Sequence, residues 1–283
     1  MSASRLMLVF GLVVAGCGGG DSTTTGLTEV DEGVAEEVIS HESTQEISVW
    51  APVEEGSWPV VFMLHGLGGD RHGLASTAAA LARAGHVVFV PDVRTTGDPA
   101  TMEHDSECAY RYMMSVAAEH GGDLDQPLTA VGHSLGGSTV LVGSLNEAAY
   151  GPGGSYDECL TGEPRPDVVV SLAGCHYEYQ GAQFGFDPST YGWGNEDAEL
   201  TLIVGGSDET CAPWQSRDAT AALRAAGYDV TYVEIEGGTH ATVIFLEEVA
   251  DGGEWIPAPD APAGTATVEA ILAAIARAGG GNT

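Results

Sequence analysis

The chain has 283 residues, 43% of them hydrophobic, which is enough to bury one substantial core, and nothing in its composition indicates a second domain. It carries nine basic residues, all of them Arg, against 41 acidic ones, so its formal net charge is −32. A surface this acidic repels polyanions, which excludes nucleic acid as an expected partner and makes a bare anionic membrane unattractive. The charge is typical of a protein selected for solubility or for a salty environment.

The N-terminus is typical of an export signal. Arg5 precedes an apolar run that ends at Val14, and this run is far shorter than the ~20 residues needed to span a bilayer. We therefore expect residues 1–16 to be a signal peptide. The small residues that end in Cys17 are similar to a bacterial lipobox, in which the Cys is lipidated and becomes the mature N-terminus.

Residues 17–26, rich in Gly and Thr, would then tether a domain formed by residues 27–283 to a membrane. These features predict an exported protein of the bacterial cell envelope, lipid-anchored at the periplasmic face or at the cell surface. An ordinary signal peptide with an incidental Cys is the alternative.

Apolar runs and helical periods alternate along the rest of the chain. Strands are expected at about 46–50, 60–64, 87–90, 128–131, 167–172, 200–204 and 229–235, and helices at about 72–84, 103–119, 138–142, 213–226 and 265–278. Irregular segments with aromatic residues at 175–198 and with prolines before the last helix interrupt this alternation. Strands that alternate with helices predict an α/β fold with a mostly parallel sheet and helices on both faces.

The sequence Gly132-His133-Ser134-Leu135-Gly136 joins a predicted strand to a predicted helix. This strand, Gly-x-Ser-x-Gly, helix context is that of a nucleophile elbow, a turn so sharp that side chains at both glycine positions would collide with the neighbouring backbone. The sequence therefore predicts that Ser134 is held out at the tip of the turn, at the positive end of the following helix, as a nucleophile.

Two partners for this serine follow the ends of other strands. Asp208 comes after the strand at 200–204, and His240 comes after the strand at 229–235. Because reactive groups gather at the carboxyl ends of parallel strands, we expect Ser134, Asp208 and His240 to meet at one edge of the sheet. Asp92 and Asp197 are the rival candidates for the acid.

Four sequence segments carry a resemblance to a known superfamily: His65-Gly66-Leu67-Gly68-Gly69, Gly132-His133-Ser134-Leu135-Gly136-Gly137, Gly205-Gly206-Ser207-Asp208 and Gly237-Gly238-Thr239-His240. Over about residues 45–278 the chain resembles the α/β-hydrolase superfamily, and in particular its uncapped bacterial serine esterases of the dienelactone-hydrolase-like, platelet-activating-factor-acetylhydrolase-like and polyester-hydrolase-like groups.

The resemblance implies a role for each residue. Ser134 would attack an ester carbonyl, His240 would act as its base, and Asp208 would orient the imidazole. The backbone N–H groups of Leu67 and Leu135 would form the oxyanion hole. It also implies no large cap domain and no cofactor, and the other histidines show no spacing that predicts a metal site. Expected substrates are small-molecule, lipid or polymer esters. No sequence feature sets the oligomeric state.

The alternatives are an amidase or peptidase with the same triad, and a surface lipoprotein that kept the fold but only binds a ligand. Tyr177, Trp193 and Trp214 are candidates to line the substrate pocket, although aromatic side chains there could equally cover the sheet edge. Polyester hydrolases usually carry an aromatic residue where this chain has Leu67, which argues against polymer activity.

Four cysteines remain in the predicted domain, and an oxidising compartment would allow two disulfides among them. Cys175 and Cys211 each follow a predicted strand, so both should lie at the same edge of the sheet. We predict the pair Cys175–Cys211, which leaves Cys108–Cys159. Four buried free thiols are the alternative.

Overall fold

The computed structural model describes residues 26–40, 46–95, 99–145, 165–179, 182–183, 186–190, 197–249 and 255–279. The signal peptide, Cys17, all but the last residue of the tether, Cys159 and Trp193 lie outside this part of the chain, so what the sequence indicates for them stays a prediction.

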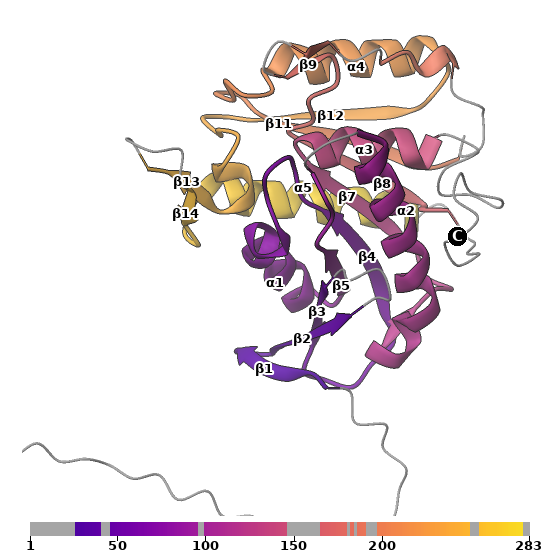
Figure 1. The fold of residues 1–283 in the computed structure, drawn as a ribbon, viewed down its shortest axis with the longest axis vertical. Coiled ribbons are helices and arrows are strands. Elements are labelled where there is room, and N and C mark those ends of the chain that lie inside the picture. Colours follow the sequence, from indigo (N-terminus) through magenta and orange to yellow (C-terminus); the bar gives the residue numbers. More distant parts are fainter. Residues whose placement is uncertain are drawn as a thin grey trace, which may run out of the picture.

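A central sheet of ten strands carries the fold (Figure 1). Its order is β1-β2-β3-β5-β4-β7-β8-β11-β12, with β6 beside β4. The neighbours from β5 to β12 pair in parallel, whereas β1, β2 and β3 form an antiparallel extension at one edge, as predicted for a mostly parallel sheet. The bounds are β1 Thr28–Asp31, β2 Val34–Ser40, β3 Glu46–Pro52, β4 Trp58–Leu64, β5 Val87–Pro91, β6 Gly122–Asp123, β7 Thr129–His133, β8 Val168–Leu172, β11 Glu199–Gly205 and β12 Val230–Ile235.

Helices cover both faces of this sheet, as predicted. Helices α2, α3 and α4 pack on one face, and α1 and α5 pack on the other. Alternate residues of β4 serve the two cores, with Phe62 on the side of α2 and Met63 on the side of α1, because successive side chains of a strand point to opposite faces. The bounds are α1 Ala75–Arg83, α2 Pro99–Val116, α3 Leu135–Leu145, α4 Pro213–Ala225 and α5 Pro262–Gly279.

Small elements surround the carboxyl ends of the strands. Between β8 and β11 the described residues form only β9 Glu178–Tyr179, β10 Ala182–Gln183 and the 3₁₀ helix η3 Pro188–Thr190. Beyond β12, the 3₁₀ helix η4 Thr242–Ile244 leads into an antiparallel pair, β13 Leu246–Glu248 and β14 Trp255–Pro257. The sequence predicts only an irregular proline-rich connection in this region. The structure corrects that prediction, because two short strands pair there. Two further 3₁₀ turns, η1 Arg71–Leu74 and η2 Ala117–His120, flank α1 and α2.

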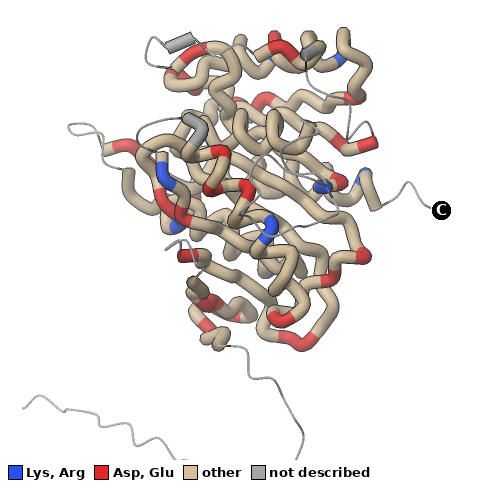
Figure 2. Tube along the Cα trace, turned by 45° about the vertical axis from the view of Figure 1, so that its right-hand side comes forward, with Lys and Arg blue, Asp and Glu red and all other residues tan. Residues whose placement is uncertain are grey.

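Acidic residues are distributed along most of the trace, with few basic ones among them (Figure 2). Several of the arginines are paired, for example Arg83 with Asp31 and Arg277 with Glu199. Within the described ranges, no helix is both long and apolar enough to cross a membrane.

Candidate functional site

Ser134 lies at a strained turn between β7 and α3. Its φ of 59° is in the left-handed region, which residues other than glycine rarely adopt. A Cβ at Gly132 would lie 2.1 Å from the carbonyl oxygen of Gly136, and a Cβ at Gly136 would lie 2.4 Å from that of His65. The predicted collision at both glycine positions is therefore confirmed, and the turn has the geometry of a nucleophile elbow.

Three side chains from different strand ends meet at this turn. The Ser134 hydroxyl lies 2.9 Å from Nε2 of His240, and the Nδ1–H of His240 donates to Oδ2 of Asp208 over 2.7 Å. All three residues are buried. The structure thus brings together the hydroxyl, imidazole and carboxylate that the sequence predicted would converge, in the arrangement that a Ser-His-Asp triad requires.

The carboxylate of Asp208 is fixed on its other side by the backbone. Its Oδ1 accepts hydrogen bonds from the N–H groups of Thr210 at 2.8 Å and Cys211 at 2.9 Å. Both carboxylate oxygens therefore have defined partners, which holds the acid in one orientation toward the imidazole.

The two rival acids lie elsewhere. Asp92 accepts a hydrogen bond from the backbone N–H of Arg71 at 2.8 Å and forms an ion pair with the guanidinium of the same residue. Asp197 is exposed and precedes β11, so it lies at the opposite end of that strand from Asp208. Neither contacts His240.

Two buried histidines support the site without joining the triad. The Nε2–H of His133 donates to the carbonyl oxygen of His240 over 2.9 Å. The Nδ1–H of His65 donates to the carbonyl oxygen of Gly66, and its Nε2 accepts from the N–H of Val93 at 3.1 Å. Burial lowers the pKa of both imidazoles, that of His133 well below its ordinary value, and so favours the neutral form, in which one ring nitrogen donates and the other accepts.

Two backbone N–H groups beside Ser134 are available to a ligand. Leu67 follows β4 on the glycine-rich loop, and Leu135 is the first residue of α3. Within the described part of the chain, neither N–H donates a hydrogen bond. For Leu135 this is expected, because the first N–H groups of a helix have no partner inside it. A Cβ at Gly66 would lie 2.6 Å from the Cβ of Ser134, so this loop passes the serine at a distance that only glycine allows.

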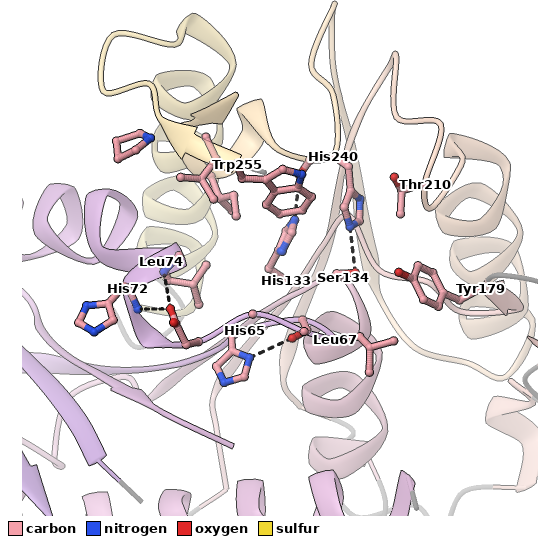
Figure 3. Close-up of a pocket in the computed structure, with 18 residues that line it drawn as sticks. His65, Leu67, His72, Leu74, His133, Ser134, Tyr179, Thr210, His240 and Trp255 are labelled. Carbon is pink, nitrogen blue, oxygen red and sulfur yellow. Dashed lines mark hydrogen bonds between the residues drawn. The ribbon is translucent and has the colours of Figure 1, made fainter. Parts of the chain in front are cut away.

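A cavity of about 560 Å³ opens beside the serine (Figure 3). Trp255 and Leu74 lie on one side of Ser134, and Tyr179 and Thr210 lie on the other. Apolar residues of η1, η4 and the β13–β14 pair line the cavity with Trp255, namely Leu74, Ile244, Leu246 and Pro257. The polar side chains of His72 and His133 lie on the same side. A molecule bound there would therefore reach the serine with an apolar group held between η1 and the β13–β14 pair.

Two of the predicted pocket residues, Tyr177 and Trp214, lie outside this cavity. Tyr177 and Trp214 stack on each other with ring centroids 5.9 Å apart and do not line this cavity. The reason is that the side chain of Gln215 accepts a hydrogen bond from the N–H of Tyr177, which fastens that residue to α4. These two rings therefore pack between the segment after β8 and the start of α4.

Sequence reasoning missed Trp255, which lines the cavity. Tyr179 lies within the aromatic segment 175–198, from which pocket residues are expected, whereas Trp255 lies outside it. Trp255 follows His240 in the chain, and an aromatic residue so soon after the imidazole was a signal that could have found it. Its ring centroid lies 5.9 Å from that of His240, so it shields one side of the imidazole.

The predicted disulfide between Cys175 and Cys211 is present in the structure. Cys108 is also disulfide-bonded, while Cys159 lies outside the described residues. Among the side chains that the structure describes, no group of three or more His, Cys, Asp or Glu is arranged to hold a metal ion.

Comparisons with known proteins agree with the architecture. Residues 59–145 match a family model described as the alpha/beta hydrolase fold. No curated protein matches the chain in sequence. Solved structures are similar to it in fold, and three of them are described next.

The first is esterase 2 of Thermogutta terrifontis with butyrate bound (17% identity, 86% of this chain and 94% of that one covered, TM-score 0.63). The second is a truncated carbohydrate esterase from gut microbiota (18% identity, 84% of this chain and 93% of that one covered, TM-score 0.59). The third is carboxyl esterase 2 of the mycorrhizal fungus Tuber melanosporum (15% identity, 89% of this chain and 89% of that one covered, TM-score 0.61). Together with the sheet order and the turn at Ser134, these matches establish that the chain has the α/β hydrolase fold.

Proposed function

We propose that the chain hydrolyses carboxylic esters through an acyl-serine intermediate. The observation that carries the proposal is the continuous hydrogen-bonded path from the Ser134 hydroxyl through His240 to Asp208, at the edge of a cavity. The three solved structures described above are esterases by name, which supports the same reaction class.

In the first half-reaction, the hydroxyl oxygen of Ser134 attacks the carbonyl carbon while His240 Nε2 takes the hydroxyl proton. The carboxylate of Asp208 stabilises the imidazolium that forms. The imidazolium then returns the proton to the leaving alcohol oxygen, which leaves the acyl group on the serine. Water repeats the sequence and releases the acid.

The negative charge that develops on the carbonyl oxygen needs donors already in place. The N–H groups of Leu67 and Leu135 flank Ser134 and fit this role. Each such donor is worth on the order of 3 kcal/mol of activation free energy, so a pair accounts for a large share of the catalysis.

The substrate proposed here is a small ester with an apolar group. The apolar side of the cavity, formed by η1 and the β13–β14 pair, gives such a group a place away from water. Anchoring through lipidated Cys17 would hold the enzyme at the cell envelope, as its N-terminal sequence predicts. Replacing Cys17 with Ser should then move the protein from the membrane fraction to the soluble one.

The test is a series of p-nitrophenyl esters of increasing acyl length, assayed beside a matched p-nitroanilide. We expect the esters to be cleaved and Ser134→Ala to lower turnover by about 10⁶-fold while the protein stays folded. Faster cleavage of the anilide would indicate an amidase, and cleavage of neither substrate would favour a ligand-binding protein. Retained turnover in the Ser134→Ala variant would disprove the mechanism.

A further inference from the structure

The disulfide between Cys175 and Cys211 lies against the proposed nucleophile. Each sulfur is 3.9 Å from the hydroxyl oxygen of Ser134, and both cysteine side chains are fully buried. Neither sulfur takes part in the proton transfers described above. Because the crosslink lies in contact with the nucleophile, it can affect the active site as well as connect two segments of the chain.

One end of the crosslink is connected to the acid. The N–H of Cys211 donates to Oδ1 of Asp208 over 2.9 Å, and the other carboxylate oxygen binds His240 at 2.7 Å. A movement of the Cys211 backbone would thus change the orientation of the carboxylate, and with it that of the imidazole.

The other end is connected to the nucleophile. The carbonyl oxygen of Cys175 accepts a hydrogen bond from the hydroxyl of Ser138 at 2.7 Å, and Ser138 lies in the first turn of α3. The N–H of Ser138 in turn donates to the carbonyl oxygen of Ser134 over 3.3 Å. The strands that carry nucleophile and acid, β7 and β11, are separated in the sheet by β8, and the disulfide joins the segments beyond β8 and β11.

We propose that the Cys175–Cys211 disulfide is a positioning element of the active site. It fixes the segment that carries Asp208 to the turn that carries Ser134, and its sulfurs form the wall that confines the hydroxyl on the side away from bulk water. This role rests on the proposed function. Because a misplacement of about 1 Å can cost on the order of 100-fold in rate, a covalent link at this point has a direct effect on the reaction.

The first test compares two double variants of the full chain. Cys175→Ala with Cys211→Ala removes the crosslink beside the serine, and Cys108→Ala with Cys159→Ala removes the second predicted pair, of which Cys108 lies on α2. Both are assayed with p-nitrophenyl butyrate, at a temperature well below the unfolding midpoint of the less stable one.

For the first double variant we expect kcat to fall by about 10- to 100-fold with KM within about twofold of the wild type, and the rate of fluorophosphonate labelling of Ser134 to fall in parallel. The control variant should keep its kcat despite its loss of stability. An equal loss of kcat in both variants, or an unchanged kcat in the folded first variant, would overturn the positioning role.

The second test keeps the disulfide and therefore does not depend on folding without it. Ser138→Ala removes the hydrogen bond to Cys175, and Ser144→Ala makes the same chemical change in α3 at a buried hydroxyl without a partner in the described chain. We expect Ser138→Ala to lower kcat by about 3- to 10-fold and Ser144→Ala to leave it unchanged. Equal kcat in the two variants would contradict the proposal.

The failure of the positioning role and the failure of the proposed function are distinguishable. Absence of both hydrolysis and labelling in the wild type would overturn the function and the positioning role together. An active wild type with unaffected variants would overturn the positioning role alone.

Discussion

Ser134 owes its position to residues that have no side chains. Gly66 lets the glycine-rich loop pass beside the serine, while Gly132 and Gly136 let α3 approach the end of β7. A side chain at Gly132 or Gly136 would meet backbone atoms, and one at Gly66 would meet the side chain of Ser134 itself. The left-handed conformation of Ser134 is strained, and the surrounding sheet and helix impose it.

The role assigned to Asp208 is tested by an isosteric change. Asp208→Asn should lower kcat by about 10³- to 10⁴-fold, because an amide neither stabilises the imidazolium nor holds the imidazole of His240 in the required tautomer. Asp92→Asn is the control, since Asp92 is paired with Arg71 and does not contact the imidazole. Steady-state kinetics with one ester substrate compare the two, and a larger loss in Asp92→Asn would identify the wrong acid.

At this scale, the backbone-determined features could be predicted and the side-chain contacts could not. Ser134, Asp208 and His240 follow strand ends, and strand ends are visible in the sequence as apolar runs followed by glycine. The placement of Tyr177 depends instead on a hydrogen bond to Gln215, a residue on another element. No local pattern encodes such a contact.

At the scale of elements, the β13–β14 pair gives the cavity its apolar side. Leu246, Trp255 and Pro257 line the cavity from these two strands. Each strand has three residues, and such short strands owe their stability to packing against the rest of the protein rather than to their own sequence. Pro257 at the end of β14 lacks a backbone N–H, so the sequence of this segment does not favour a strand.

The long central strands, unlike β13 and β14, can be predicted from their own amino-acid composition. Strands such as β4 and β5 are continuous apolar runs because both faces are buried under helices, and this composition identifies them without knowledge of their neighbours. Their helical connections predict parallel pairing, whereas the order of the strands in the sheet is known only from the structure. Most of the fold could therefore be predicted, while the small elements that shape the cavity could not.

A substitution in β14 tests the function of this element. Trp255→Ala should lower kcat/KM by about 10-fold or more for an ester with a bulky apolar group and change it little for a small acetate ester, because only the larger group uses the apolar side. Ile256→Ala is the matched control, since Ile256 is exposed in the same strand and does not line the cavity. An equal loss for both esters would contradict the assignment of this side to the substrate.

At the scale of the whole molecule, the protein combines an acidic surface with buried neutral imidazoles. Burial lowers the pKa of five histidines, namely His65, His86, His120, His133 and His176. The pKa of His176 is lowered to about 3 by burial. The acidic composition could be read from the sequence, but the burial of particular histidines requires the folded arrangement.

These histidines make the protein sensitive to acid. An imidazole in the unfolded chain takes up a proton below a pH of about 6.5, whereas His176 in the fold stays neutral down to about 3. The unfolded state thus binds more protons over this range, and the free energy of unfolding falls as the pH falls, by roughly 1.4 kcal/mol per pH unit for this one group.

His176→Gln should remove this contribution, so its free energy of unfolding should fall less steeply than that of the wild type between pH 6 and pH 4. Glutamine retains an acceptor for the Ser171 hydroxyl, which lies 3.3 Å from Nε2 of His176. Urea unfolding at several pH values measures both slopes. Parallel curves for the two proteins would show that His176 does not titrate as its burial requires.

The central claim is that Ser134 is a nucleophile activated by His240, and covalent labelling tests it most directly. The purified protein is treated with a fluorophosphonate, and the modified residue is identified by intact mass and peptide mapping. The account predicts one adduct, located on Ser134, and none in the Ser134→Ala variant. A folded wild-type protein that takes up no label, or takes it up at another residue, would contradict it.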